Sequence, residues 1–120
     1  ENDSFDFAID CFASTDIEIL NGRAFARDEM IRVLRPDGYL MLYLLSSDDE
    51  FHKEMSRLRP AHESNSFLHT TGKFEKAFNK EELLEFYKML KLVEEFRISK
   101  KSTFFGKEYA SNHFWFVFQK

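Results

Sequence analysis

Residues 32–45 have the sequence Arg-Val-Leu-Arg-Pro-Asp-Gly-Tyr-Leu-Met-Leu-Tyr-Leu-Leu. The first part closes an amphipathic helix, and Pro36-Asp37-Gly38 predicts a turn. The apolar run that follows is too continuous for a strand with one wet face, and it is typical of a strand buried on both faces. The chain is therefore expected to pass from a helix into a central strand through this short turn.

A second strand is expected before that helix. Residues 5–12 are Phe-Asp-Phe-Ala-Ile-Asp-Cys-Phe, whose Phe and Ile content favours a strand. A helix is expected over residues 23–34, with Arg23 among the solvated charges. Its apolar stripe consists of Ala26, Met30, Val33 and Leu34. Strand, helix and strand together predict one right-handed βαβ crossover in a parallel sheet.

Two further helices and a long loop follow this crossover. Ser47 and Glu50 have the spacing of a capping box at the start of one helix, and Asn79 is the expected N-cap of the other. Residues 59–73 between these helices are polar and have no clear period. We expect a long loop there, of the kind that often binds or covers a substrate.

The C-terminal part of the sequence predicts an antiparallel pair of strands. Residues 92–99 alternate between apolar and polar side chains, and residues 113–119 are almost wholly aromatic or aliphatic. The polar segment 100–111 is expected to connect them, with a turn at Gly106.

Composition limits the class of protein. A chain of 120 residues with 15 Phe can bury one aromatic-rich core, so a single domain is expected. The net charge of −4 and dispersed Lys and Arg argue against nucleic-acid binding. No apolar run approaches the roughly 20 residues that span a bilayer. The single cysteine, Cys11, cannot form an internal disulfide, which is compatible with a cytoplasmic protein.

Two segments also carry a family resemblance. Asn2-Asp3-Ser4-Phe5-Asp6-Phe7-Ala8-Ile9, then a helix ending Arg32-Val33-Leu34-Arg35-Pro36-Asp37-Gly38 and an apolar strand, resemble the second half of class I S-adenosylmethionine-dependent methyltransferases. The resemblance implies a partial doubly wound, Rossmann-like α/β sheet with flanking helices. Its strands would be the family's strands four to seven, the last two antiparallel. Residues 1–120 would form one domain, the C-terminal half, without the N-terminal cofactor-binding half.

The same resemblance bears on the cofactor. The family holds S-adenosylmethionine through a glycine-rich turn and an acidic residue, whereas the four glycines of this chain are widely separated. We therefore expect this chain alone to be inactive and not to bind the cofactor. The resemblance places Asp10, Cys11, Phe12 and Ala13 beside the methionine part of the cofactor. From the residues alone, Cys11 is expected to be a small apolar core residue, and a position that lines the cofactor is the alternative.

Candidate substrate residues lie in the loop of residues 59–73. His62, Glu63 and His69 would contact a small-molecule acceptor if this loop is a lid, and otherwise they are ordinary exposed loop residues. The sequence identifies no catalytic residue. The histidines at 52, 62, 69 and 113 match no metal-ligand spacing, so no metal site is expected.

Two functions remain open at this point. The first is methyl transfer to a small molecule by the enzyme of which this chain would be the C-terminal part. The second is a non-enzymatic α/β module that associates through an exposed sheet edge at residues 5–12, because an exposed apolar edge readily pairs with another chain. A homodimer, or association with a missing N-terminal half, would follow.

Overall fold

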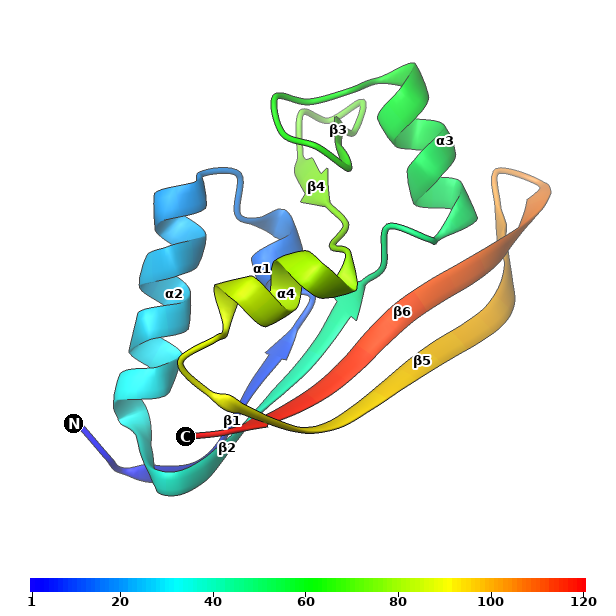
Figure 1. Cartoon of the computed structure of the whole chain (residues 1–120). Coiled ribbons are helices and arrows are strands. Elements are labelled where there is room, and N and C mark those ends of the chain that lie inside the picture. Colours follow the sequence, from blue (N-terminus) through cyan, green and yellow to red (C-terminus); the bar gives the residue numbers. More distant parts are fainter.

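The computed structural model describes all residues, 1–120. Its main sheet has four strands in the order β1-β2-β6-β5. These are β1 (Phe5–Cys11), β2 (Leu34–Leu45), β5 (Lys91–Phe104) and β6 (Lys107–Gln119). β1 and β2 are parallel, whereas β6 runs antiparallel to both β2 and β5. The predicted α/β class, the crossover and the antiparallel last pair are confirmed (Figure 1).

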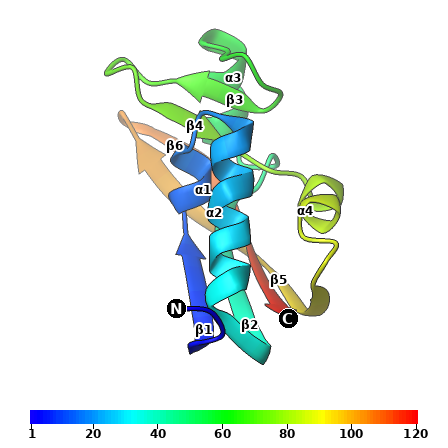
Figure 2. The same ribbon diagram turned by 90° about the vertical axis from the view of Figure 1, so that its left-hand side faces the viewer.

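Four helices and a small second sheet surround the main sheet. The helices are α1 (Ala13–Asp16), α2 (Leu20–Val33), α3 (Glu50–Leu58) and α4 (Lys80–Phe86). The second sheet pairs β3 (Ser66–Leu68) with β4 (Phe74–Lys76). Figures 1 and 2 show α2 and α4 on the same side of the main sheet, with α3 and the small sheet beyond the end of β2. None of these helices is long and apolar enough to cross a membrane.

The turn between α2 and β2 needs its glycine because backbone atoms approach closely. A Cβ at Gly38 would lie 2.9 Å from the carbonyl oxygen of Arg35 and 3.2 Å from that of Asp6. Asp37, which precedes it, has a φ of 65°, in the left-handed region that aspartate tolerates better than most residues. This local geometry brings β2 alongside β1 directly after the helix.

The hydrophobic core lies between the sheet and the helices α2 and α4. Alternate residues of the two central strands form its floor, and each is at most 1% exposed: Leu40, Leu42, Leu44, Phe114, Phe116 and Phe118. Leu83 and Tyr87 from α4 and its C-terminal end cover them. The apolar residues of β2 on this face therefore form part of the hydrophobic core.

The opposite face of the sheet is apolar and has no helix over it. Phe7, Ile9 and Phe96 are 57%, 62% and 54% exposed, and Cys11 is exposed beside them. We call this surface the open face; its more central residues are the half-buried Tyr39, Met41, Tyr43 and Trp115. The prediction that β2 is buried on both faces is therefore wrong for this chain, because its helices cover one face only. The prediction of a core position for Cys11 is wrong for the same reason.

Three local predictions also need correction. The segment 100–111 is not a loop: β5 and β6 continue through it as a hairpin that extends beyond β2. Its side chains are polar because most of this ribbon faces water. The N-cap of α3 is Asp49 instead of Ser47, since the Asp49 carboxylate accepts the backbone N–H of His52 at 2.9 Å. The loop over residues 59–73 contains β3.

Candidate functional site

The candidate site lies where β1 and β2 end. The carboxyl ends of parallel strands meet at one edge of a sheet, and ligands of open α/β sheets bind at that edge. Here β1 ends at Cys11 and β2 at Leu45. The β5–β6 hairpin continues past both, so it forms a floor next to this edge.

The segment after β1 is a tight turn held by Asp10. The Asp10 carboxylate is 2% exposed and accepts hydrogen bonds from the backbone N–H groups of Ala13 (2.8 Å) and Ser14 (3.2 Å), and from the Ser14 hydroxyl. Phe12 has a φ of 61° within this turn. Asp10 thus holds the loop in place, while the Cys11 thiol is exposed and Phe12 is half-buried.

The turn after β1 could form only one wall of a cofactor site. It can offer the Cys11 thiol, the Phe12 ring and the Ala13 methyl to an apolar part of a ligand. The Asp10 carboxylate already accepts three hydrogen bonds, so it is poorly placed to anchor a ribose or an amino group. The glycines at 22, 38, 72 and 106 lie apart in the fold and form no glycine-rich turn.

An aromatic cluster joins this turn to the end of the sheet. The Phe12 ring lies 4.8 Å from the ring of Tyr43 and 5.3 Å from that of His113, both in edge-to-face geometry. Trp115 lies 5.9 Å from Tyr43 on the same face. Such contacts fix ring orientation, so the imidazole of His113 is held next to the turn after β1.

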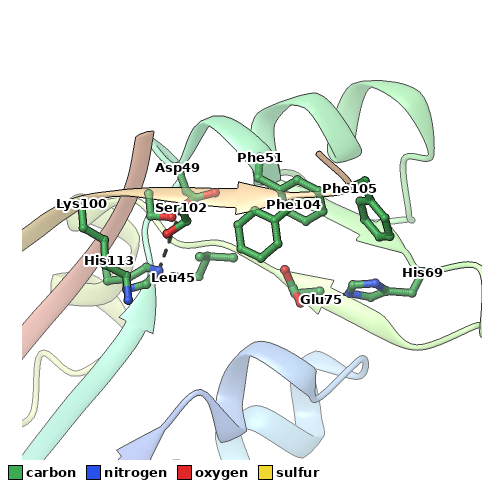
Figure 3. A pocket seen from close by; sticks show the side chains of 11 residues that line it. Leu45, Asp49, Phe51, His69, Glu75, Lys100, Ser102, Phe104, Phe105 and His113 are labelled. Atoms are coloured by element: carbon green, nitrogen blue, oxygen red, sulfur yellow. Dashed lines mark hydrogen bonds and ion pairs between the residues drawn. The ribbon is translucent and has the colours of Figure 1, made fainter. Parts of the chain in front are cut away.

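His113 also lines a cavity of about 320 Å³. It lies between α3, β4 and the β5–β6 hairpin (Figure 3). Its apolar lining consists of Leu45, Phe51, Phe104 and Phe105, and its polar lining of Asp49, His69, Glu75, Lys100, Ser102, Ser111 and His113. This size and an apolar surface with a few polar groups are typical of small-molecule sites.

His113 has a defined partner at each ring nitrogen. Its Nδ1 lies 2.8 Å from the Tyr43 hydroxyl oxygen, and its Nε2 lies 4.0 Å from a carboxylate oxygen of Asp49. Burial lowers the pKa of His113 from its ordinary value of 6.5; Asp49 opposes this shift and Lys100 adds to it. The lowered pKa favours the neutral imidazole at physiological pH.

Glu75 marks the other end of the cavity. Its carboxylate lies 3.4 Å from Nδ1 of His52 and 3.0 Å from Nε2 of His69. Burial by itself would raise the pKa of Glu75, but the hydrogen bonds with His52 and His69 outweigh it and leave this pKa below its ordinary value of 4.5. His52 is buried, and its Nε2 also bonds the carbonyl oxygen of Asn65 at 2.8 Å. This end of the cavity is therefore a fixed polar network.

The fold separates His69 from the other two predicted substrate residues. His69 lines the cavity, whereas His62 and Glu63, whose Nε2 and Oε1 atoms lie 3.6 Å apart, do not. Glu63 pairs with Arg23 of α2, which is 2% exposed and not solvated as predicted. His62 is exposed and stacks on Phe74. Substrate contact by these three residues stays a prediction.

Several residues of the site are not predicted by the sequence. No role is expected there for Tyr43, Asp49, His113 or Trp115. Phe104 and Phe105 belong to the segment that was expected to be a plain connection. The one available signal was His113, a titratable residue at the start of an otherwise apolar strand. No group of three or more His, Cys, Asp or Glu side chains could hold a metal ion.

Comparison with known proteins gives matches among solved structures only. No protein-family model and no curated protein matches the sequence. A SAM-dependent methyltransferase from Methanosarcina mazei is 25% identical, with a TM-score of 0.79, over 99% of this chain and 60% of that chain. The 1,6-didemethyltoxoflavin-N1-methyltransferase of Burkholderia thailandensis is 15% identical, with a TM-score of 0.70, over 100% of this chain and 45% of that one. A possible histamine N-methyltransferase from Thermotoga maritima is 17% identical, with a TM-score of 0.64, over 100% of this chain and 58% of that one.

These matches confirm the resemblance predicted from the sequence. The chain has the Rossmann-like fold of S-adenosylmethionine-dependent methyltransferases, over a part that is consistent with their C-terminal half. It spans about half to three-fifths of the length of the three structures named above.

Proposed function

We propose that this chain is the acceptor-binding part of an S-adenosylmethionine-dependent methyltransferase that acts on a small molecule. The observation that carries the proposal is the match with the M. mazei methyltransferase over 99% of the chain. A cavity with an aromatic wall lies beside the carboxyl ends of β1 and β2, where ligands of this sheet type bind. Fold and cavity therefore support the same function.

The chemistry of the cavity supports a small, flat acceptor. Phe51 and Phe104 stack with ring centres 4.5 Å apart, and both line the cavity. The names of two neighbours concern methylation at nitrogen, of 1,6-didemethyltoxoflavin in one and of histamine in the other. We propose an aromatic or heteroaromatic acceptor that carries an N–H or O–H group.

The proposed contribution to cofactor binding is limited to the turn after β1. Cys11, Phe12 and Ala13 would pack against the methionine part, with Asp10 holding their backbone. S-adenosylmethionine supplies, when bound, an activated methyl group on a sulfonium. Because this chain offers one wall, we propose that it neither binds the cofactor nor transfers methyl groups by itself. A cytoplasmic location would suit the exposed, unpaired thiol of Cys11.

Methyl transfer to small molecules tests this function. The protein as its gene encodes it would be incubated with S-adenosylmethionine labelled in the methyl group and with a small-molecule extract from its own organism. We expect label in an aromatic small molecule, and less of it when S-adenosylhomocysteine competes. Label in macromolecules alone, or no transfer at all, would contradict the proposal.

A second candidate function is supported by the open face. β1 is an edge strand, and its Phe7 and Ile9 side chains are more than half exposed on that face. Apolar edges and patches of this kind are typical of surfaces that pair with another chain. An association module, as a homodimer or with a covering N-terminal half, would use this surface without chemistry.

A further inference from the structure

The cavity has different chemistry at its two ends. Figure 3 shows His113 and Asp49 at one end, Glu75 and His69 at the other, and the Phe51 and Phe104 rings between them. Glu75 is already bonded to two histidines, so that end is saturated. The end at His113 is the one that adjoins Phe12 and the turn after β1.

We propose that His113 is the general base of the reaction, and that the cavity between α3, β4 and the β5–β6 hairpin holds the methyl acceptor with its N–H or O–H group at Nε2 of His113. This inference rests on the proposed function and deepens it. General bases must lie within hydrogen-bond reach of the proton that they remove, and His113 is the histidine that lines the cavity at the reacting edge.

Tyr43 orients this imidazole, and Asp49 supplies a negative charge opposite it. For Nε2 to accept a proton, Nδ1 carries the hydrogen and donates it to the Tyr43 hydroxyl oxygen at 2.8 Å. Asp49 faces Nε2 at 4.0 Å. The Asp49 carboxylate cannot swing away, because it accepts the backbone N–H groups of His52 and Asn112, each at 2.9 Å. Tyr43 is thus a positioning residue, and Asp49 is a fixed counter-charge.

The surroundings favour the neutral base before the reaction. Burial lowers the pKa of His113, and the nearby Lys100 acts in the same direction. The facing groups are therefore Asp49, Lys100 and the Tyr43 hydroxyl. A neutral imidazole at neutral pH can accept a proton, as general base catalysis requires.

The proposed proton transfer involves only the acceptor, His113 and Asp49. The N–H or O–H bond of the acceptor breaks, the proton moves to Nε2 of His113, and the electron pair stays on the acceptor atom, which becomes the nucleophile. The imidazolium that forms faces the Asp49 carboxylate. No oxidant or further reactant is needed.

The other histidines lie outside the cavity or at its far end from the turn after β1. His52 is buried and bonded through Nε2 to the carbonyl oxygen of Asn65. Nε2 of His69 is bonded to Glu75 at the far end of the cavity. His62 lies outside the cavity.

Binding of 4-nitrophenol to the 120-residue chain tests the inference without cofactor. This probe is flat, fits a small aromatic site and carries one acidic O–H group. At a pH between the folded-state pKa of His113 and that of the phenol, we expect 4-nitrophenol to bind more tightly than 4-nitroanisole, because its O–H group donates a hydrogen bond to the neutral imidazole. This advantage should be lost as the pH falls and His113 becomes protonated. The matched probe 4-nitroanisole has no acidic proton and measures binding to the aromatic walls alone.

Matched variants assign the effect to the base. His113→Gln should abolish the loss of 4-nitrophenol affinity at low pH, because glutamine does not titrate, and should weaken 4-nitrophenol about tenfold, with 4-nitroanisole affected less than about twofold. Tyr43→Phe keeps the ring and should reduce the advantage of 4-nitrophenol over 4-nitroanisole in part. Tyr39→Phe, the same change on the same strand away from the cavity, should leave this advantage intact. An unchanged pH dependence in His113→Gln, or no binding of either probe, would overturn the inference.

Activity separates this inference from the proposed function. In the gene-encoded protein, His113→Gln should lower kcat about a hundredfold with little change in the KM for S-adenosylmethionine. Unchanged kcat would overturn the role of His113 and leave the methyltransferase standing. Binding of 4-nitrophenol that depends on His113, together with no methyl transfer by the gene-encoded protein, would instead refute the proposed function, and with it the role of His113 as base in methyl transfer.

Discussion

The two faces of the main sheet have similar side chains and opposite environments. On the face toward α2 and α4, Leu42 and Phe116 are at most 1% exposed. On the open face, Phe7, Ile9 and Phe96 are all more than half exposed. Both sets are large and apolar, so residue type does not distinguish them. Burial here depends on which helices the chain supplies and where the crossover places them.

This difference shows which part of the fold is complete in this chain. The covered face forms a core with α4 and its C-terminal Tyr87, and all the side chains of this core come from this chain. The open face exposes apolar area that would be stabilised by any covering partner, since apolar surface removed from water contributes about 25 cal/mol per Å². Substitutions on the two faces should therefore have very different consequences.

The largest expected effect comes from the covered face. Leu42→Ala removes a fully buried side chain and should lower the free energy of unfolding by about 2–5 kcal/mol, because it leaves a cavity between β2 and the helices. The matched change Ile9→Ala on the open face should cost no more than about 0.5 kcal/mol. Urea unfolding of both variants measures this contrast. Equal losses would mean that the open face is covered in solution.

Self-association through the open face would remove the difference in exposure between the two faces of the sheet. If the chain pairs through β1 and the open face, Phe7→Lys with Ile9→Lys should convert a dimer to a monomer, because charges on an edge strand oppose pairing. Even a tenfold increase in the dissociation constant of the dimer corresponds to a loss of about 1.4 kcal/mol in the free energy of association. Phe25→Lys, on the exposed surface of α2, is the control for the same chemical change.

Solution mass and thiol labelling measure this association. Cys11 is the single cysteine and is exposed on the open face, so its labelling rate reports whether this face is covered. We expect slow labelling in a dimer and fast labelling in the double variant. A wild-type monomer with rapid labelling would exclude homodimerisation through this face.

Local sequence signals predicted most of the fold. Apolar runs and capping residues gave the order of strands and helices because these signals act within a few residues of the chain. The length of the β5–β6 hairpin was missed because paired residues such as Thr103 and Glu108 are polar and exposed, so no apolar pattern marks them as strands. The N-cap Asp49 was missed because its second partner, Asn112, lies far away in the sequence.

The candidate site was harder to predict from the sequence, because its residues come from distant parts of the chain. Asp10, Cys11, Phe12 and Ala13 are contiguous, so a resemblance could point to the turn after β1. The cavity instead combines Phe51 from α3, Glu75 from β4 and His113 from β6. Only tertiary structure brings these residues together, and no local pattern marks them as partners. For Glu63, the ion pair with Arg23 similarly joins residues from distant parts of the chain.

The smallest of the three effects concerns His113, which lies at the one end of the open face that other elements cover. Burial lowers its pKa in the folded chain below the ordinary 6.5. The unfolded chain therefore binds the proton more readily. The contribution of neutral His113 to stability is fully present above about pH 6.5 and is lost as pH falls through the folded-state pKa.

Wild type should lose more stability than His113→Gln as the pH is lowered from about 8 to about 5. Urea unfolding across this range measures the difference. Parallel curves for the two proteins would contradict the lowered pKa of His113, and with it the burial of the imidazole that is the main cause of this shift.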